Sequence, residues 1–262
     1  HGLLHAIKNK VQVHIFYQSY WSDTGLERII NPYFLKEFKN RWYLIGLDDD
    51  AHPITASFIE KCTTLFHANS KLGIIAFQEV RGVFESDDLA LEQAEKEVIH
   101  YQTNDFIGCG FAIKKEVYQK TNGFPLWMDI YGEETCVAYE VLDADYEIIY
   151  DNSIIVNHRV NKLQRQQQGK YYFRFQKQLK NTIFFFMVYR KHPLKLILKT
   201  ILHNFRKYAL KDLTYFKLFW VALFQVLFHF FSVLKYRKPI NNATLQKIKQ
   251  LQLTMAKCCI VL

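Results

Sequence analysis

Short apolar runs separated by polar turns fill the first 47 residues of this 262-residue chain. Three runs are rich in β-branched and aromatic residues and alternate roughly between apolar and polar positions: VQVHIFYQS, RIINPYFLKEF and RWYLIGL. The two-residue turn Lys39-Asn40 joins the last two. Because alternation with period two is typical of half-buried strands, the pattern predicts a meander of short strands, preceded by the short helical stretch LLHAIKNK.

Strand-like and helix-like segments alternate between residues 44 and 158. KLGIIAF and YEIIYDNSIIVNH have the apolar runs of buried strands, and FIGCGFA reads as a strand followed by a short helix. Residues 54–70 and ETCVAYEVLDAD have helical character. This alternation predicts an α/β layer with a partly parallel sheet, and ligands bind such sheets at the carboxyl ends of the strands.

From Tyr171 onward the pattern is helical, with breaks at Pro193 and Pro239. The longest run without a formal charge, Leu218 to Leu234, has 17 residues, which is the lower limit for a helix that spans a membrane. Two interpretations stay open for these helices. They form an amphipathic, membrane-associating tail, or they are core helices packed on the preceding domain.

Charge is distributed very unevenly along the chain. Residues 1–160 carry 14 Lys+Arg and 24 Asp+Glu, a net charge of −10, whereas residues 161–240 carry 17 Lys+Arg and one acid, a net charge of +16. The tail therefore requires a polyanionic partner, and we expect residues 171–240 to bind an anionic membrane surface. A nucleic-acid partner is less favoured, because the apolar positions are too continuous for a solvated phosphate-binding face.

Five cysteines are scattered along the chain, and none forms a CxxC pair. This usage favours a reducing compartment over a disulfide-stapled secreted domain. Together with the basic tail, it predicts a cytoplasmic protein that is peripheral at the inner face of the cell membrane.

Acidic clusters and one histidine are the candidate site residues. Asp48, Asp49 and Asp50 follow the apolar run YLIGL; they are a solvated turn or, alternatively, ligands for a hard cation such as Mg²⁺ or Mn²⁺. Glu133 and Glu134 begin the helix ETCVAYEVL, where acids stabilise the helix N-terminus and where a carboxylate can also act as a general base. A sixth candidate, His158, follows the strand SIIVN and is a surface residue or a metal ligand.

The order of these motifs resembles family 2 glycosyltransferases, which have the GT-A fold, over about residues 47–240. The resemblance implies an incomplete GT-A-like (Rossmann-like) sheet with flanking helices. It assigns Asp48 and Asp50 to the Asp-x-Asp motif, so that Asp48, Asp49 and Asp50 bind the donor diphosphate. Asp48, Asp50 and His158 would then bind the metal. The family's acidic pair falls on Glu133 and Glu134, which makes Glu134 the candidate base.

The same resemblance places an acceptor side on a later stretch. The glycine-rich strand with Gly108 and Gly110 and the turn Asn122-Gly123-Phe124 match it, with Asn in place of the usual first Gly, and Trp127 and Asp129 follow. The implied reaction moves a sugar from a nucleotide-sugar donor to a glycan or lipid-linked acceptor in bacterial cell-envelope polysaccharide synthesis.

Residues 3–47 resemble a different family, the WYL domain of bacterial transcriptional regulators, through the tripeptide Trp42-Tyr43-Leu44. This resemblance implies an alternative function, that of a ligand-binding regulator fragment. Only 47 residues precede Asp48, too few for several βα units of about 30 residues each, so the donor-binding half is expected to be missing and activity to be low. We therefore expect three parts, residues 1–47, 48–165 and 166–262, and hypothesise a gene fusion within LIGLDDDA.

Overall fold

The N-terminal segment contains two antiparallel strand pairs. The computed structural model describes residues 13–17, 26–30, 34–38, 41–45, 51–160 and 172–258. Strand β1 (Val13–Tyr17) pairs with β2 (Leu26–Ile30), and β3 (Phe34–Phe38) pairs with β4 (Arg41–Ile45). The predicted β-rich start is confirmed, and Trp42 to Leu44 lie in β4. Both predicted part boundaries, 47/48 and 165/166, and the predicted ligands Asp48, Asp49 and Asp50 lie outside the described residues.

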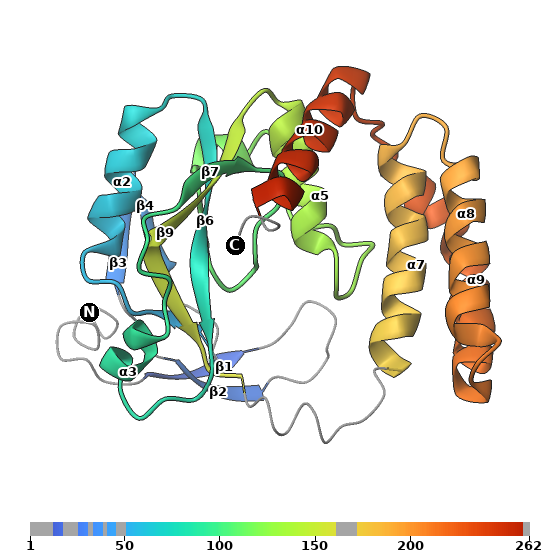
Figure 1. Cartoon of the computed structure of the whole chain (residues 1–262), viewed down its shortest axis with the longest axis horizontal. Coiled ribbons are helices and arrows are strands. Elements are labelled where there is room, and N and C mark those ends of the chain that lie inside the picture. Colours follow the sequence, from blue (N-terminus) through green and yellow to red (C-terminus); the bar gives the residue numbers. More distant parts are fainter. Residues whose placement is uncertain are drawn as a thin grey trace.

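A five-stranded mixed sheet forms the centre of the molecule (Figure 1). The long strand β9 pairs in parallel with β6, and the other pairings, β5 with β9, β7 with β9 and β8 with β6, are antiparallel. The predicted partly parallel sheet is therefore correct, with one parallel pair in the described sheet. The strand bounds are β5 Ala51–Pro53, β6 Leu72–Arg81, β7 His100–Thr103, β8 Phe111–Ile113 and β9 Glu147–His158.

Strand β9 contains an irregularity that explains why its sequence suggested one or two strands. Its register with β6 jumps from Asp151 opposite Phe77 to Ile155 opposite Gln78. The buried Asn152 in this bulge uses its side chain on another segment, accepting a hydrogen bond from the Ile99 amide at 2.8 Å. Strand β9 therefore continues through the bulge, and the buried side chain of Asn152 is hydrogen-bonded to a neighbouring segment.

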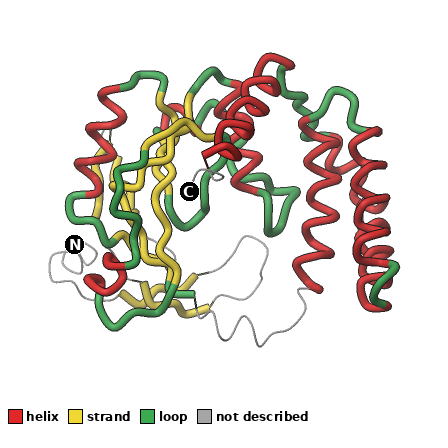
Figure 2. Tube along the Cα trace, in the orientation of Figure 1, coloured by secondary structure: helices red, strands yellow, loops and turns green. Residues whose placement is uncertain are grey.

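Helices cover both faces of the sheet (Figure 2). From Ile74 onward, alternate residues of β6 point to opposite sides: Ile75 and Phe77 pack with Cys62 of one helix, whereas Ile74 and Ala76 join the core built on another. Because both faces are covered, β6 reads as a continuous apolar run rather than an alternating one. These helices are α2 (Phe58–Ala68) on the first side and α5 (Glu133–Asp143) with the short α4 (Lys115–Tyr118) on the second; α3 (Asp87–Glu92) follows β6.

The C-terminal helices pack beside the sheet domain. Helix α7 (Tyr172–Tyr189) lies alongside α9 (Leu213–Leu234), and their buried residues belong to one core cluster that also includes residues of α5 and β9. One face of α9 is therefore a core face. The predicted breaks at Pro193 and Pro239 are confirmed. The remaining elements are α8 (Leu194–Asn204), the π-helical turn η1 (Phe205–Ala209) and α10 (Asn242–Cys258).

A buried acid, Glu140 of α5, joins three segments. Its carboxylate accepts hydrogen bonds from the Asn122 amide at 2.8 Å, the Tyr189 hydroxyl at 2.8 Å and the Lys238 ammonium at 2.7 Å. The Asn122 side chain adds a fourth bond to Glu140 at 3.1 Å, which gives a physical reason for Asn at a position where the resemblance has Gly. The adjacent Gly123 has φ +69°, and a Cβ there would lie 2.7 Å from the Tyr118 hydroxyl.

Candidate functional site

A cavity of about 920 Å³ lies between the start of α5 and the C-terminal helices. Its wall combines carboxyl, hydroxyl, guanidinium and aromatic groups, which suits a polar ligand with apolar faces. The side chain of Arg174 packs over the Tyr131 ring, 5.0 Å from its centroid. The lining residues that matter for its chemistry are Asp105, Tyr131, Glu134, Thr135, Arg174 and Tyr215.

Glu134 is the predicted base, and it lines this cavity. It occupies the first turn of α5, which begins after Gly132 in the left-handed region at φ 111°. Burial raises the pKa of Glu134, and the charge of Asp105 raises it further, while backbone amides including that of Gly108 oppose the shift. A carboxylate whose pKa is raised is a stronger base than a solvated one, so the site fits proton abstraction.

Two more carboxyls near Glu134 also have raised pKa values. Burial raises the pKa of Asp105, which accepts a hydrogen bond from the Thr135 hydroxyl at 3.0 Å. Burial and the neighbouring charges of Glu134 and Asp129 raise the pKa of Glu133. One carboxylate oxygen of Glu133, Oε2, is buried without a hydrogen-bond partner in the described part of the chain. The start of α5 is thus an acidic and partly dehydrated region.

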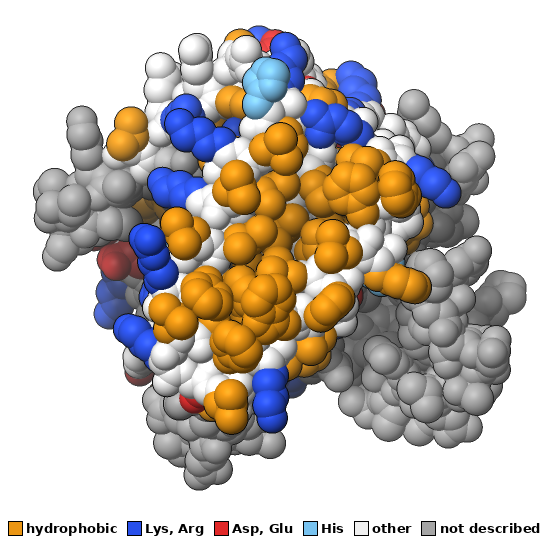
Figure 3. All heavy atoms as spheres, turned by 90° about the vertical axis from the view of Figure 1, so that its right-hand side faces the viewer, with side chains coloured by type: hydrophobic (Ala, Val, Ile, Leu, Met, Phe, Trp, Pro, Cys, Tyr) orange, Lys and Arg blue, Asp and Glu red, His pale blue; other side chains and the backbone are white. Residues whose placement is uncertain are grey.

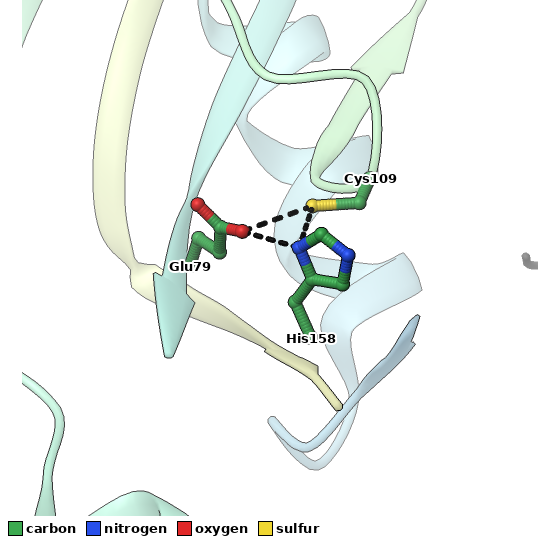
Figure 4. Close-up of side chains that lie close together, drawn as sticks. All are labelled: Glu79, Cys109 and His158. Atoms are coloured by element: carbon green, nitrogen blue, oxygen red, sulfur yellow. Dashed lines mark hydrogen bonds and ion pairs between the residues drawn. The ribbon is translucent and has the colours of Figure 1, made fainter. Parts of the chain in front are cut away.

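Glu79, Cys109 and His158 form a second cluster (Figure 4). Glu79 lies near the end of β6 and His158 at the end of β9; the two strands are parallel, so both side chains reach the same edge of the sheet. The Cys109 Sγ atom is 3.5 Å from His158 Nδ1 and 3.6 Å from Glu79 Oε1. Glu79 Oε1 and His158 Nδ1 are in direct contact.

The surroundings of this second cluster shift the pKa values of Glu79 and Cys109 in opposite directions. Burial acts to raise the pKa of Glu79, but hydrogen bonds from Arg81 and His158 outweigh it and hold the pKa below its usual range. Arg81 takes the other carboxylate oxygen, Oε2, at 2.8 Å. Burial and the negative charge of Glu79 raise the pKa of the Cys109 thiol to about 12. Without a metal, therefore, this thiol is protonated at neutral pH.

The segment Gly108-Cys109-Gly110 connects the two clusters. Cys109 contacts His158, and the neighbouring Gly108 lies against Glu134, where an added Cβ would be 2.5 Å from Oε1. At Gly110, an added Cβ would lie 2.9 Å from Val156 Cγ2. Glycine at both positions leaves room for these neighbouring side chains. Glu134 and His158 therefore lie next to adjacent residues of one short turn, Gly108 and Cys109.

The two glycines should respond differently to alanine. In Gly108→Ala the clash is with the end of a flexible side chain, so we expect the free energy of unfolding to fall by less than about 1 kcal/mol while Glu134 is displaced. In Gly110→Ala the clash is with a buried strand residue, and overpacking should cost about 1–3 kcal/mol. Chemical denaturation of both variants measures this difference. Equal destabilisation would contradict the packing described for the segment.

The strand after the three aspartates reaches His158. Ala51, directly following Asp50 in sequence, pairs with His158 in the register of β5 and β9. His52 pairs with Asn157, and its side chain contacts Asp87 at 2.8 Å. The backbone register therefore brings the residue next to the predicted Asp-x-Asp motif to the predicted histidine ligand.

The donor atoms around His158 fit the implied Mg²⁺ poorly. Mg²⁺ prefers oxygen ligands in octahedral geometry, whereas the described cluster offers one thiol, one imidazole and one carboxylate. Mn²⁺ accepts imidazole and carboxylate more readily, but a thiol still favours softer ions. This is a disagreement between the resemblance and the side chains that surround its predicted histidine.

The predicted acceptor-side residues have structural contacts. Asp129 forms ion pairs with Lys177 and, at 3.1 Å, with Lys180 of α7. Burial acts to raise the pKa of Asp129, but the hydrogen bonds and charges of the two lysines outweigh it and hold the pKa well below its usual range. Trp127 packs near the rings of Phe184 and Tyr189. Neither Trp127 nor Asp129, nor Gly110, lines the cavity, and their acceptor role stays a prediction.

Glu79, Cys109, Asp105 and Arg174 were not among the residues expected from sequence. For Glu79 a signal was present, because it ends an apolar strand, KLGIIAFQEV, and strand ends are where ligands bind. Cys109 lies between two glycines that were singled out. No sequence signal indicates that Asp105 and Arg174 line one cavity, since only the packing of α7 against α5 brings them there.

An exposed apolar surface covers α8 and α9 (Figure 3). Phe228 and Phe231 are 85% and 79% exposed, and lysine and arginine side chains surround the apolar area. We call this surface the α8–α9 apolar face. It consists of Leu194, Leu198, Leu202, Leu210, Leu213, Phe216, Trp220, Val221, Phe224, Leu227, Phe228, Phe230 and Phe231.

A contiguous apolar face of this kind marks an interaction site in a soluble domain. Helix α9 is also long and apolar enough to cross a membrane by length and composition, with 22% of its most apolar window buried inside the molecule. Its buried residues Phe219, Ala222, Val226 and Val233 belong to the core cluster. Helix α9 therefore has one core face, as the packing interpretation predicts, and one exposed apolar face; association with a membrane stays a prediction.

One family model, described as WYL domain, matches residues 2–55. No curated protein and no solved structure matches the chain. The match confirms the WYL resemblance predicted for residues 3–47 and extends it at its C-terminal side to residue 55, so that Asp48, Asp49, Asp50 and β5 fall inside the matched range. The glycosyltransferase resemblance finds no support in these comparisons.

Proposed function

We propose that this protein is a glycosyltransferase of the family 2 type, with a GT-A-like sheet, that transfers a sugar from a nucleotide-sugar donor to a lipid-linked or glycan acceptor. The observation that carries the proposal is the pairing of Ala51 with His158, which places the residue after Asp50 next to the predicted histidine ligand. His158 in turn contacts Cys109, and the adjacent Gly108 lies close to Glu134. The proposal is supported further by the raised pKa of Glu134 at the wall of a polar cavity.

Glu134 accepts the proton of the acceptor hydroxyl in this scheme. Its burial and the nearby charge of Asp105 make the carboxylate basic enough for that step. Arg174, which lines the same cavity, offers hydrogen-bond donors that orient a hydroxyl-rich or anionic acceptor. A divalent ion at the Asp48, Asp50 and His158 end would supply stabilisation of the departing diphosphate.

Replacing Glu134 by Gln should lower transfer by about 10²–10⁴-fold, the usual contribution of a general base. In the active protein, turnover should rise with pH through a pKa above the ordinary carboxyl value, because the base must be ionised and its pKa is raised. A panel of nucleotide sugars with vesicles containing lipid-linked acceptors provides the assay.

Two variants serve as controls for the assay. Glu133→Gln, at the neighbouring acid, should retain more activity than Glu134→Gln, and Glu116→Gln, at an exposed acid on α4, should retain all of it. Equal turnover by Glu134→Gln and the unmodified chain would refute the assignment of the base. Lack of Glu134-dependent turnover with every donor would refute glycosyl transfer.

The acceptor is proposed to be at an anionic membrane, on its cytoplasmic side. Support comes from the α8–α9 apolar face and from the exposed basic residues on the same segment: Lys195, Lys199, Arg206, Lys207, Lys211, Lys217 and Lys235. An apolar face bordered by cations is complementary to the acyl boundary and anionic headgroups of a bilayer. Docking there would put the neighbouring cavity close to lipid-linked acceptors.

A second function, that of a WYL-type ligand-binding regulator, is favoured by the family match at residues 2–55. The matched range includes the N-terminal strand pairs and the three aspartates, so in this function both belong to the WYL domain. Stabilisation by Mn²⁺ with a nucleoside diphosphate separates the two functions, because ligand binding to the native state raises the unfolding temperature. A shift that disappears in Asp50→Ala supports sugar transfer, and a chain that gives no shift favours the regulator.

A further inference from the structure

We propose that Glu79, Cys109 and His158 form a three-ligand site for Zn²⁺ or a similar thiophilic transition-metal ion. Each residue offers one ligand atom, and the three atoms lie within 4.8 Å of one another. They come from three segments of the chain, namely β6, the turn before β8 and the end of β9, so only the folded protein assembles them (Figure 4). The proposal rests on the proposed function only in that it assigns a thiophilic ion to it in place of Mg²⁺ or Mn²⁺. Binding of the metal itself does not depend on sugar transfer.

The distances fit a tetrahedral ion. Ligand atoms about 2.0–2.3 Å from such an ion lie roughly 3.3–3.8 Å from each other. The two distances from Cys109 Sγ, 3.5 Å to His158 and 3.6 Å to Glu79, already have this spacing. The third pair, Glu79 and His158, is in direct contact and has to separate when the ion enters.

The combination of donor atoms selects the kind of metal. Thiolate sulfur, imidazole nitrogen and carboxylate oxygen are the three ligand types of protein-bound Zn²⁺. A thiolate disfavours Mg²⁺ and Ca²⁺, which take oxygen ligands. Three protein ligands are typical of catalytic zinc sites, in which the fourth position is left for water or substrate.

The surroundings hold the ligands in place. Arg81 binds the second carboxylate oxygen of Glu79 at 2.8 Å and leaves Oε1 directed at the cluster. Gly108 and Gly110 on both sides of Cys109 pass so close to Glu134 and Val156 that neither position has room for a Cβ without a shift. Ligands oriented by such neighbours bind metals more tightly than mobile side chains do.

Cobalt provides a spectroscopic test in the full chain. Metal-free protein titrated with Co²⁺ should develop a thiolate-to-cobalt charge-transfer band in the near ultraviolet, and one equivalent of Zn²⁺ should remove it. Cys109→Ser and His158→Asn should each abolish the band or weaken Co²⁺ binding severely. Arg81→Ala should keep the band but weaken binding about 10–100-fold, since it removes only an orienting contact.

The chain offers a matched control in two other cysteines. Cys258→Ser/Cys259→Ser changes two thiols at the end of α10 and beyond it and should leave the band intact. If Cys109→Ser fails to fold, as judged by circular dichroism, Glu79→Gln takes its place and should weaken Co²⁺ binding.

Each result decides between named alternatives. No band in the unmodified chain, or a band that persists in Cys109→Ser, overturns the site and leaves an ordinary Glu–His ion pair beside a thiol. A band without Glu134-dependent turnover supports the metal site and refutes glycosyl transfer. Turnover with Mg²⁺ that is unchanged in Cys109→Ser supports glycosyl transfer and refutes the thiolate-bound ion as the metal of that reaction.

Discussion

Replacing Phe224, Phe228 and Phe231 by serine should release this protein from anionic vesicles. These three side chains are among the most exposed of the α8–α9 apolar face. Full burial of a phenylalanine is worth about 1.5–3 kcal/mol, so partial insertion of three should contribute roughly 3 kcal/mol, or about 100-fold in partitioning. Co-sedimentation with vesicles that contain anionic lipid measures the loss.

A matched control removes exposed apolar side chains elsewhere. Val83, Val98 and Leu126 are 69%, 86% and 74% exposed but lie outside α8 and α9, and their serine variants should bind vesicles as the unmodified chain does. Neutral vesicles and high salt should weaken binding, because the surrounding lysines act through headgroup charge. If the unmodified chain ignores vesicles and instead forms a dimer that the triple variant dissociates, the face is a self-association surface and membrane docking is wrong.

Replacing Glu140 by alanine should produce the largest loss of stability. Glu140 is 3% exposed and receives hydrogen bonds from Asn122, Tyr189 and Lys238. Removing one partner from a buried charged network typically costs about 3–5 kcal/mol, and Lys238, which is partly exposed, can recover some hydration. We therefore expect about 3 kcal/mol, or roughly 6–12 °C in Tm for a chain of this size.

Differential scanning calorimetry against Glu116→Ala provides the comparison. Glu116 is an exposed acid on α4, and its alanine variant should remain within about 0.5 kcal/mol of the unmodified protein. Glu140→Gln preserves shape and two hydrogen-bonding groups and should lie between the two. A loss below about 1 kcal/mol in Glu140→Ala would show that the network does not join α5, α7 and the segment before α10.

Local patterns were reliable where one strong signal set the structure. The apolar run KLGIIAF became β6, the helical run ETCVAYEVLDAD became α5, and the breaks at Pro193 and Pro239 separate helices as expected. Proline ends a helix through its missing amide and ring geometry, which needs no tertiary information. Short strands such as β5 and β7 were missed, because three or four residues carry no readable period.

The candidate site was only partly accessible from sequence. Glu134 and His158 could be named because each sits at the end of a recognisable helix or strand. Cys109 and Glu79 can be recognised as possible ligands only in the folded structure. There the parallel pairing of β6 and β9 brings two strand ends together beside the turn at Gly108-Gly110. Trp127 and Asp129, expected on the acceptor side, fasten their loop to α7 by ring packing and ion pairs.

Local patterns were enough to predict the β-rich start with its WYL resemblance, the α/β order of the body, and the division between an acidic body and a basic helical tail. These follow from local periodicity, proline positions and net charge, which do not depend on distant contacts. The folded structure was needed to show which face of α9 is buried and that a thiol lies beside His158. Such facts depend on pairing between residues far apart in the chain.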